Sequence, residues 1–518
     1  MSTEFLFGAV LLFAAAYLLL PRPFRPVFLT ASTIAFVVDG GVQAAVYFFV
    51  SGLSAWIAAM ITYQLRTEAN RNARQESERE KKHAIKKRAA RLGGLCVGLA
   101  LAVQLSLLVF LKLLPDLPQA LASSLFGREV RLPHLFAPIG ISFYTFMFAS
   151  YMFDVHSGKL KAQKNPFRVF LFAGYPPQLI QGPIGRFGEM DRQFFKTTPV
   201  GIEDVRRGLL LMLFGLFKKK VVADRAAGFV GAVFDTPSGN FGGAAALLAV
   251  LLYSLQQYCD FSGGIDIVIG GARMMGIRLP DNFRRPYFSA SLAEFWRRWH
   301  ITLGTWMRDY VFYPIALSKP VSGLAACFKK ASPTFAKALP AVIANLFVFL
   351  LVGLWHGINE HYVIWGLYNG VIIGMAVLLE PVSKAFNRRF SFTSSQAFHV
   401  FRVLRTFLIV NIGWFFDRSA SAGQAIALLR SLGDFRPEQL TLDFLSGNGL
   451  SAENMIILVC SAVFLFLLSL LAERGADIPE KLMQLPLPVR WTLIFVFVLC
   501  IVLFFDTGNT RTFMYAAF

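Results

Sequence analysis

Residues 338–356 read ALPAVIANLFVFLLVGLWH and contain no Asp, Glu, Lys or Arg. An α-helix needs about 20 mostly apolar residues to cross the hydrocarbon core of a bilayer, so this stretch predicts a membrane-spanning helix. Similar runs recur along the chain, in which 55% of the residues are hydrophobic and only 16% are charged. This composition excludes a soluble multidomain enzyme, a secreted disulfide scaffold and a disordered protein. We therefore expect an all-α polytopic membrane protein.

The apolar runs predict about 11 to 13 transmembrane helices, at roughly 20 residues for each span. Residues 242–258 and 264–276 are expected to form one pair of these spans. Residues 166–184 contain several Gly and Pro, which would leave backbone groups unpaired in lipid. This segment is therefore expected to be broken or re-entrant, and either buried in protein or lining a wet cavity.

We expect a single integral-membrane domain over residues 1–518. Its expected parts are N-terminal spans in 1–153, a catalytic core in 154–380 and C-terminal spans in 381–518.

The net charge of +20 is large enough to raise the question of nucleic-acid binding. Its densest basic stretch, residues 66–92, lies between two apolar runs, as do the smaller patches around residues 159–168, 218–220, 319–337 and 384–389. Lys and Arg accumulate on cytoplasmic loops of polytopic proteins, so these patches predict topology, and both termini come out extracytoplasmic. Anionic lipid headgroups are the expected contact, and nucleic acid is not.

Residues 280–314 place several Arg residues and a histidine among aromatic side chains. Ser291 and Glu294 have the spacing of a capping box, which predicts that a helix starts there. On one continuous helix Trp296, His300 and Leu303 would share a face, and Glu294 would pair with Arg298. The alternative is an interfacial helix whose Arg and Trp side chains lie at the headgroups.

His356 ends the apolar run of residues 338–356. We expect it to lie below the outer surface, with Gly353 and Gly357 allowing a neighbour to approach closely. The alternative places Trp355 and His356 in the interfacial aromatic belt. Polar groups at membrane depth are costly, and they are functional candidates by default.

Other motifs give little support to rival chemistry. The five cysteines are scattered without metal-ligand spacing, so no metal site is predicted. Neither a phosphate-binding GxxxxGK[ST] loop, nor GxSxG, nor HExxH occurs. Asp260 and Asp266 are expected to cap or pack, because their spacing of six does not place them on one helix face.

A neutral imidazole at membrane depth can take a proton from a hydroxyl group and return it to a leaving group, as acyl transfer requires. An accompanying oxyanion donor is needed as well. Trp indole N–H, backbone N–H near the glycines and Arg guanidinium groups remain open as candidates.

The stretches YCDFSGGIDIVIGGARMMGIRLPDNFRRPY, SLAEFWRRWHITLGTWMRDYVFYP and LVGLWHG resemble the membrane-bound O-acyltransferase family. They are most similar to its bacterial branch of alginate O-acetyltransferase and teichoic-acid D-alanyltransferase membrane subunits. PIGISFYTF at 138–146, QGPIGRF at 181–187 and the C-terminal FMYAAF extend the resemblance. The chain departs from the pattern at Gly264 and Ile265, which puts a hydroxyl-based role there in doubt, whereas Asp266 keeps its place.

The resemblance implies a ring-like helix bundle, with re-entrant and interfacial helices, around a central tunnel in the bacterial cytoplasmic membrane. It implies that His356 is the catalytic histidine and that His300 is the second functional histidine. The residues that it implies as lining the tunnel or the substrate site are Trp296, Arg297, Trp299, Trp355, Asp266 and Gln181.

The main hypothesis is an O-acyltransferase that moves an acyl group, most simply acetyl, from a cytoplasmic thioester to an exopolysaccharide or cell-wall glycan. The donor would be acetyl-CoA or a phosphopantetheinyl acyl carrier protein, with no bound cofactor, and an extracytoplasmic SGNH-type acetyltransferase would be a partner. One alternative transfers D-alanine from a carrier protein. Another is a transporter for a glycan or lipid-linked sugar, without acyl chemistry.

Overall fold

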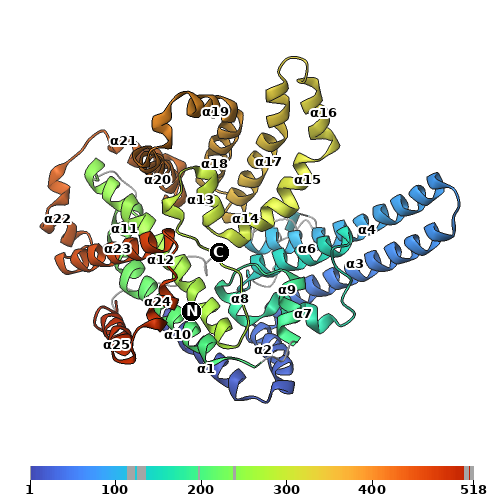
Figure 1. The fold of residues 1–518 in the computed structure, drawn as a ribbon, viewed down its shortest axis with the longest axis horizontal. Coiled ribbons are helices and arrows are strands. Elements are labelled where there is room, and N and C mark those ends of the chain that lie inside the picture. Colours follow the sequence, from blue (N-terminus) through green and yellow to red (C-terminus); the bar gives the residue numbers. More distant parts are fainter. Residues whose placement is uncertain are drawn as a thin grey trace. The chain divides into compact units, whose positions relative to one another are not determined.

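The computed structural model describes residues 2–113, 123–124, 136–195, 199–236, 241–506 and residue 513. All regular elements among these residues are helices, and the one β-type contact is an isolated bridge between Phe283 and Trp299 (Figure 1). The all-α prediction is confirmed. Of the C-terminal FMYAAF stretch, only Phe513 is among the described residues.

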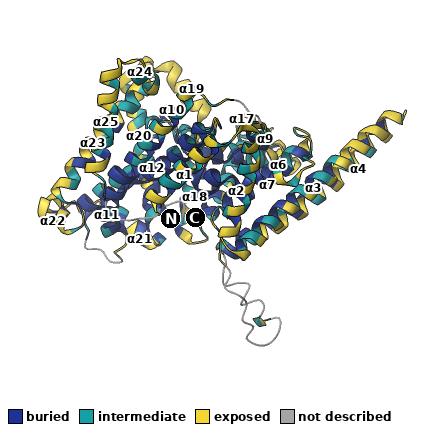
Figure 2. Cartoon of the chain, turned by 90° about the horizontal axis from the view of Figure 1, so that it is seen from below, coloured by how far each residue is buried: buried dark blue, intermediate teal, exposed yellow. Residues whose placement is uncertain are grey.

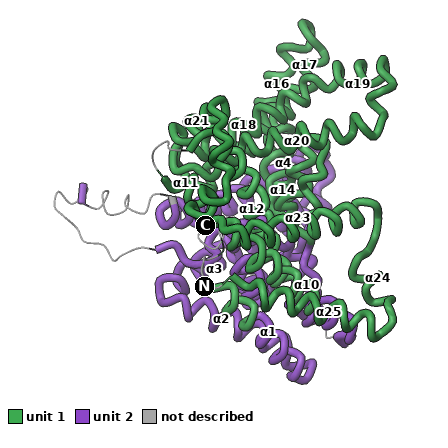
Figure 3. The backbone as a smooth tube through the Cα atoms, turned by 90° about the vertical axis from the view of Figure 1, so that its left-hand side faces the viewer, with its two compact units in different colours: residues 1–9, 209–270, 281–518 green, residues 10–208, 271–280 purple. Residues whose placement is uncertain are grey.

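The chain divides into two compact units (Figure 3). Unit 1 comprises Met1–Ala9, Leu209–Gly270 and Asp281–Phe518, and unit 2 comprises Val10–Gly208 and Gly271–Pro280. Three helices contribute residues to both units: α1 (Thr3–Leu19), α10 (Ile202–Leu216) and α12 (Gly243–Met274). The expected division at residues 153 and 380 stays a prediction.

Unit 2 contains a long hairpin of two helices, α3 (Val42–Gln75) and α4 (Arg79–Leu108), which pack side by side. Residues 66–92 were predicted as a loop, and this is wrong, because they are helical except at 76–78. Lys, Arg, Glu and Ala are good helix formers, so the helices continue beyond their apolar parts. Figure 2 shows that this end of the hairpin is largely exposed.

The other elements of unit 2 are α2 (Arg25–Asp39), η2 (Val109–Leu113), α6 (Ile141–Ser157), α7 (Pro166–Gly174), α8 (Pro176–Gln181) and α9 (Phe187–Phe195).

The Gly- and Pro-rich segment 166–184 forms two short helices, α7 and α8, which are separated at Tyr175. Every residue from 169 to 185 is buried. The segment is therefore broken and enclosed by protein, as its composition predicts.

Unit 1 holds the remaining helices. They are η3 (Phe217–Ala223), α11 (Asp224–Phe234), η4 (Pro286–Phe288), α13 (Leu292–Arg298), α14 (Ile301–Met307), η5 (Arg308–Phe312), α15 (Tyr313–Ala316), α16 (Lys319–Cys327), α17 (Pro333–His356), α18 (Glu360–Leu378), α19 (Glu380–Arg389), η6 (Ser391–Ser394), α20 (Gln396–Arg418), α21 (Ala422–Ser431), η7 (Pro437–Leu440), α22 (Leu442–Gly447), α23 (Ala452–Glu473), α24 (Ile478–Gln484) and α25 (Leu487–Leu503).

The predicted pair of spans at 242–258 and 264–276 is a single 32-residue helix, α12, so that prediction is wrong. A glycine between the two predicted spans serves a close helix contact. A Cβ atom on Gly263 would lie 2.7 Å from the carbonyl oxygen of Gly215, and one on Gly215 would lie 2.4 Å from that of Gly263. Glycine at both positions lets the two backbones meet.

Seven described helices are long and apolar enough to cross a membrane. They are α3, α4 continued to Lys112, α12, α17, α18, α20 and α23. Two shorter apolar helices, α1 and α25, have 17 residues each. The seven long helices are fewer than the expected 11 to 13 transmembrane helices. One reason is that the apolar runs at 26–38 and 135–153 lie in helices of only 15 and 17 residues. The polytopic architecture is supported, and the central tunnel stays a prediction.

Three consecutive lysines, Lys218, Lys219 and Lys220, lie on the π-helix η3 with side chains only 4%, 1% and 1% exposed. Their assignment to a cytoplasmic basic patch is therefore wrong. Buried charges require ionic or hydrogen-bonding partners, and carboxylates supply them. The ion pairs join Lys218 to Asp266, Lys219 to Asp260 and Asp224, and Lys220 to Asp224 and Glu4.

We predict that Lys219→Met strongly destabilises the protein, because it leaves buried Asp260 and Asp224 without their shared cation. Breaking a buried ion pair costs about 3–5 kcal/mol. The matched control is Lys384→Met, since Lys384 pairs with Glu380 on an exposed helix surface, where a pair contributes less than about 1 kcal/mol. Thermal unfolding of the purified protein in detergent measures both variants. Equal midpoints for the two variants would contradict the prediction.

Candidate functional site

The predicted capping box starts α13. The Ser291 hydroxyl accepts a hydrogen bond from the Glu294 backbone N–H at 3.2 Å, and Glu294 accepts one from the Ala290 N–H at 3.0 Å. The predicted pair between Glu294 and Arg298 is also present, at 2.7 Å. The sequence thus located both the start of this helix and its first ion pair.

The prediction of one continuous helix through His300 is wrong. Helix α13 ends at Arg298, and His300 adopts left-handed backbone angles, with φ of 45° and ψ of 53°, before α14 begins at Ile301. Trp296, His300 and Leu303 therefore do not share a helix face. A non-glycine residue in this conformation is costly and persists only where the surrounding structure holds it.

Residues 281–285 hold this break by pairing antiparallel with residues 298–301. The Arg284 N–H donates to the Arg298 carbonyl at 2.9 Å, and the Ile301 N–H donates to the Asn282 carbonyl at 3.0 Å. Between these bonds lies the bridge that joins Phe283 to Trp299. The pairing satisfies backbone groups that the interrupted helix leaves unbonded.

His300 is buried, with 4% of its surface exposed. Its Nδ1 atom lies 3.2 Å from Asn282 Oδ1, and the ring of Phe261 meets its ring edge-on with centroids 4.9 Å apart. Burial lowers the pKa of His300 to about 3, because the charged form loses its hydration. The imidazole is therefore neutral at physiological pH.

His356 is the last residue of α17, and it is 8% exposed, as expected for a recessed position. Gly353 and Gly366 allow α17 and α18 to touch, since a Cβ atom on Gly353 would lie 2.5 Å from the Tyr362 carbonyl oxygen. The imidazole packs against Trp355 and Trp365, with ring centroids 5.0 Å away in each case. This confirms the close approach predicted at Gly353.

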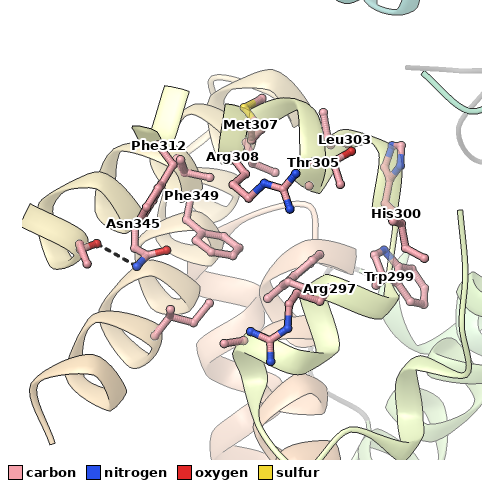
Figure 4. Close-up of a pocket in the computed structure, with 18 of the residues that line it drawn as sticks. Arg297, Trp299, His300, Leu303, Thr305, Met307, Arg308, Phe312, Asn345 and Phe349 are labelled. Atoms are coloured by element: carbon pink, nitrogen blue, oxygen red, sulfur yellow. Dashed lines mark hydrogen bonds between the residues drawn. The ribbon is translucent and has the colours of Figure 1, made fainter. Parts of the chain in front are cut away.

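His300 and His356 line one cavity of about 530 Å³ within unit 1 (Figure 4). Trp296, Arg297 and Trp299, which were predicted to line the substrate site, also line it. The α17 residues on its wall are Ala341, Asn345, Val348, Phe349, Val352 and His356, which follow one helix face. The helix rises about 22 Å over the fifteen steps from Ala341 to His356, so the cavity is elongated.

Three predicted residues are not among those that line this cavity in the described part of the chain. Trp355 lies behind the wall, with its ring 6.5 Å from that of His300. Asp266 instead pairs with Lys218 and holds α12 on η3. Gln181 belongs to unit 2, where it is fully buried at the end of α8.

The wall is largely aromatic and apolar, with two guanidinium groups at its exposed positions. Arg308 contacts Asp309 at 3.0 Å, whereas Arg297 makes no ion pair with any described residue. Figure 4 shows Arg297 and Arg308 among the labelled side chains of the cavity. Trp296 is less available as an oxyanion donor, because its indole N–H already donates to Asn369 at 3.0 Å.

Sequence reasoning missed Asn282, Trp365 and Trp414 as parts of the site. Trp365 and Trp414 line the cavity, and their rings stack with centroids 6.4 Å apart. Single tryptophans in apolar runs look like packing residues, and no local pattern marks these two. Asn282 had a weak signal, since it is a polar residue between two prolines at the start of the segment that mixes Arg with aromatic residues.

Comparisons with known proteins identify the family of this chain. Residues 163–415 match the family model described as MBOAT, membrane-bound O-acyltransferase family. A Pseudomonas syringae pv. tomato protein named "Probable alginate O-acetylase AlgI" is 35% identical over 67% of this chain and 61% of its own length. The Helicobacter pylori peptidoglycan O-acetyltransferase is 30% identical over 58% of this chain and 57% of its own length. The Bacillus subtilis teichoic acid D-alanyltransferase is 28% identical over 49% of this chain and 62% of its own length.

This chain thus spans about six tenths of the length of the curated relatives that it matches. The matched family region contains His300, Asn282 and His356, together with most of the cavity wall. The chain belongs to the membrane-bound O-acyltransferase family.

Proposed function

We propose that this protein transfers an acyl group, most simply acetyl, from a thioester to an acceptor hydroxyl group on the route to an extracytoplasmic glycan. The observation that carries the proposal is that His300 and His356 line the same elongated, largely apolar cavity. Such a cavity can hold a thioester arm and limit its hydrolysis by water. The relatives named for alginate, peptidoglycan and teichoic acid support a polysaccharide or wall polymer as acceptor.

In the proposed reaction His356 takes the proton from the acceptor hydroxyl, and the oxygen attacks the thioester carbonyl carbon. The C–S bond then breaks, and the imidazolium returns the proton to the leaving thiolate. The products are an ester and a free thiol, so atoms and charges balance. His300 holds the donor, and the guanidinium group of Arg308 stabilises the oxyanion.

Either acetyl-CoA or a phosphopantetheinyl carrier protein would suit this site as the donor, because both carry phosphate on a thioester arm. Arg guanidinium groups bind phosphate well, and Arg297 has no ionic partner among the described residues. Lys329, Lys330 and Lys337 lie near the start of α17, with His356 at its other end. The excess of Lys and Arg makes the first end cytoplasmic, so the donor would enter there, in the bacterial cytoplasmic membrane.

An extracytoplasmic SGNH-type acetyltransferase would accept the group and complete its delivery to the glycan. The D-alanyl alternative keeps the same steps and changes the transferred group. It is favoured by one observation, the 28% identity to a teichoic acid D-alanyltransferase. Offering the purified protein acetyl-CoA and a D-alanyl-loaded carrier protein in parallel separates the two donors.

We predict that His356→Ala lowers thioester-dependent acyl transfer at least about 10²-fold, because a positioned general base contributes about 10² to 10⁴ in rate. Purified protein in nanodiscs, given radiolabelled acetyl thioester, measures the transfer. His399→Ala is the matched control, since His399 is exposed on α20 and does not line the cavity. Wild-type rates in His356→Ala would rule out the assigned role.

We predict that Arg297→Gln raises the KM for acetyl-CoA about tenfold or more, because a hydrogen bond to a charged group contributes about 1.5–3 kcal/mol. The KM for S-acetylpantetheine, which has no phosphate, should change little. Arg284→Gln is the control, because Arg284 is exposed, pairs with Asp281 and does not line the cavity. An equal rise for both donors would show that Arg297 does not bind phosphate.

A further inference from the structure

Asn282 is a buried asparagine, 1% exposed, whose side-chain oxygen has three neighbours. Its Oδ1 atom accepts hydrogen bonds from the Thr302 backbone N–H at 3.0 Å and from the Thr302 hydroxyl at 2.9 Å. The third neighbour is His300 Nδ1, at 3.2 Å. The side chain therefore lies against both the histidine and the start of α14.

The Thr302 N–H fixes which end of the Asn282 amide faces His300. A backbone N–H can only donate, so the atom that it meets must be the amide oxygen and not the NH₂ group. An amide oxygen can only accept, so the His300 Nδ1 atom beside it must carry the proton. In a neutral imidazole, Nε2 then bears the lone pair.

We propose that Asn282 is a positioning residue that holds His300 as the tautomer with its proton on Nδ1, so that Nε2 accepts a hydrogen bond from the acyl donor. The inference rests on the proposed function, in which His300 holds the donor. The chemical class recognised is a thioester arm with amide N–H groups, such as pantetheine. Asn282 would thus select a donor that offers an N–H at this point of the cavity.

The backbone of Asn282 serves the same purpose as its side chain. Its carbonyl oxygen accepts the Ile301 N–H at 3.0 Å, directly after His300 in the chain. Asn282 therefore contacts the histidine side chain, the next residue's backbone and the first turn of α14. A residue that held only the backbone would not need the contact to Nδ1.

Several ionisable groups lie on the elements that surround His300. They are Tyr258, Asp260, Asp266, Asp281, Arg284, Arg285, Glu294, Arg297, Arg298, Arg308 and His356. Most of the charged ones form ion pairs: Arg284 with Asp281, Arg285 and Arg298 with Glu473, and Asp260 and Asp266 with Lys219 and Lys218. Burial lowers the pKa of His300.

The test introduces a negative charge without removing the acceptor oxygen. In Asn282→Asp, the carboxylate still accepts both Thr302 hydrogen bonds but stabilises the imidazolium form, and an adjacent opposite charge raises a pKa by about 1–3 units. As the pH falls through the raised pKa, His300 gains a proton on Nε2 and can no longer accept. We expect the donor KM of this variant to rise several-fold between pH 8 and pH 4, with kcat little changed.

The matched control is Asn411→Asp, which adds the same charge at another buried asparagine of unit 1. Asn411 contacts Ser254 and Phe407 and does not line the cavity. Its KM should follow the wild-type pH dependence. If the KM of Asn282→Asp also follows the wild-type profile while the protein remains folded, the inference is overturned.

Solid-state ¹⁵N NMR of histidine-labelled protein in lipid vesicles reads the tautomer without any assay of transfer. We expect a protonated Nδ1 and an unprotonated Nε2 for the His300 signal, which is assigned by its loss in His300→Gln. In Asn282→Leu the preference for this tautomer should be lost. Protonated Nε2 in the wild type would overturn the inference. If the wild type shows the expected tautomer but His300→Gln still transfers the acyl group at the wild-type rate, only the proposed role of His300 is overturned.

Discussion

The antiparallel pairing of residues 281–285 with residues 298–301 is the interaction on which the site depends. Without it, the sequence from Leu292 to Phe312 has the composition of a continuous amphipathic helix. The two backbone bonds end α13 at Arg298 and hold His300 in left-handed backbone angles. This reversal places the imidazole against Asn282 and Phe261 on the cavity wall. The costly backbone conformation of His300 thus places its side chain on the cavity wall.

The buried ion pairs of η3 stabilise the position of the helix behind His300. Asp260 and Asp266 fasten α12 to the lysines of η3, and Phe261, which touches His300, follows Asp260 directly. Removing one partner would leave an uncompensated charge in a region of low dielectric constant, so the pairs resist sliding or rotation of α12. The charges therefore fix the helix that carries the aromatic wall behind the histidine.

The sequence was sufficient for the local features and insufficient for those that depend on distant partners. The cap at Ser291, the Glu294–Arg298 pair and the recessed His356 follow from spacing and composition within one segment. The break at His300 does not, because the bridge partner Phe283 lies 16 residues before Trp299 and an α-helical period continues through the break. Likewise, three adjacent lysines look like an exposed patch until Asp260 and Asp266 are placed beside them.

The length of the cavity can be compared with the thickness of the hydrocarbon core of a membrane. Its lining on α17 rises about 22 Å from Ala341 to His356, compared with about 30 Å for the hydrocarbon core. A thioester arm that enters near the basic end of α17 would therefore need to extend through most of the bilayer to reach His356. In the proposed reaction, such a path would favour a long, flexible donor arm over a compact acyl phosphate. The neutral His300 and the guanidinium groups would then meet the polar atoms of that arm.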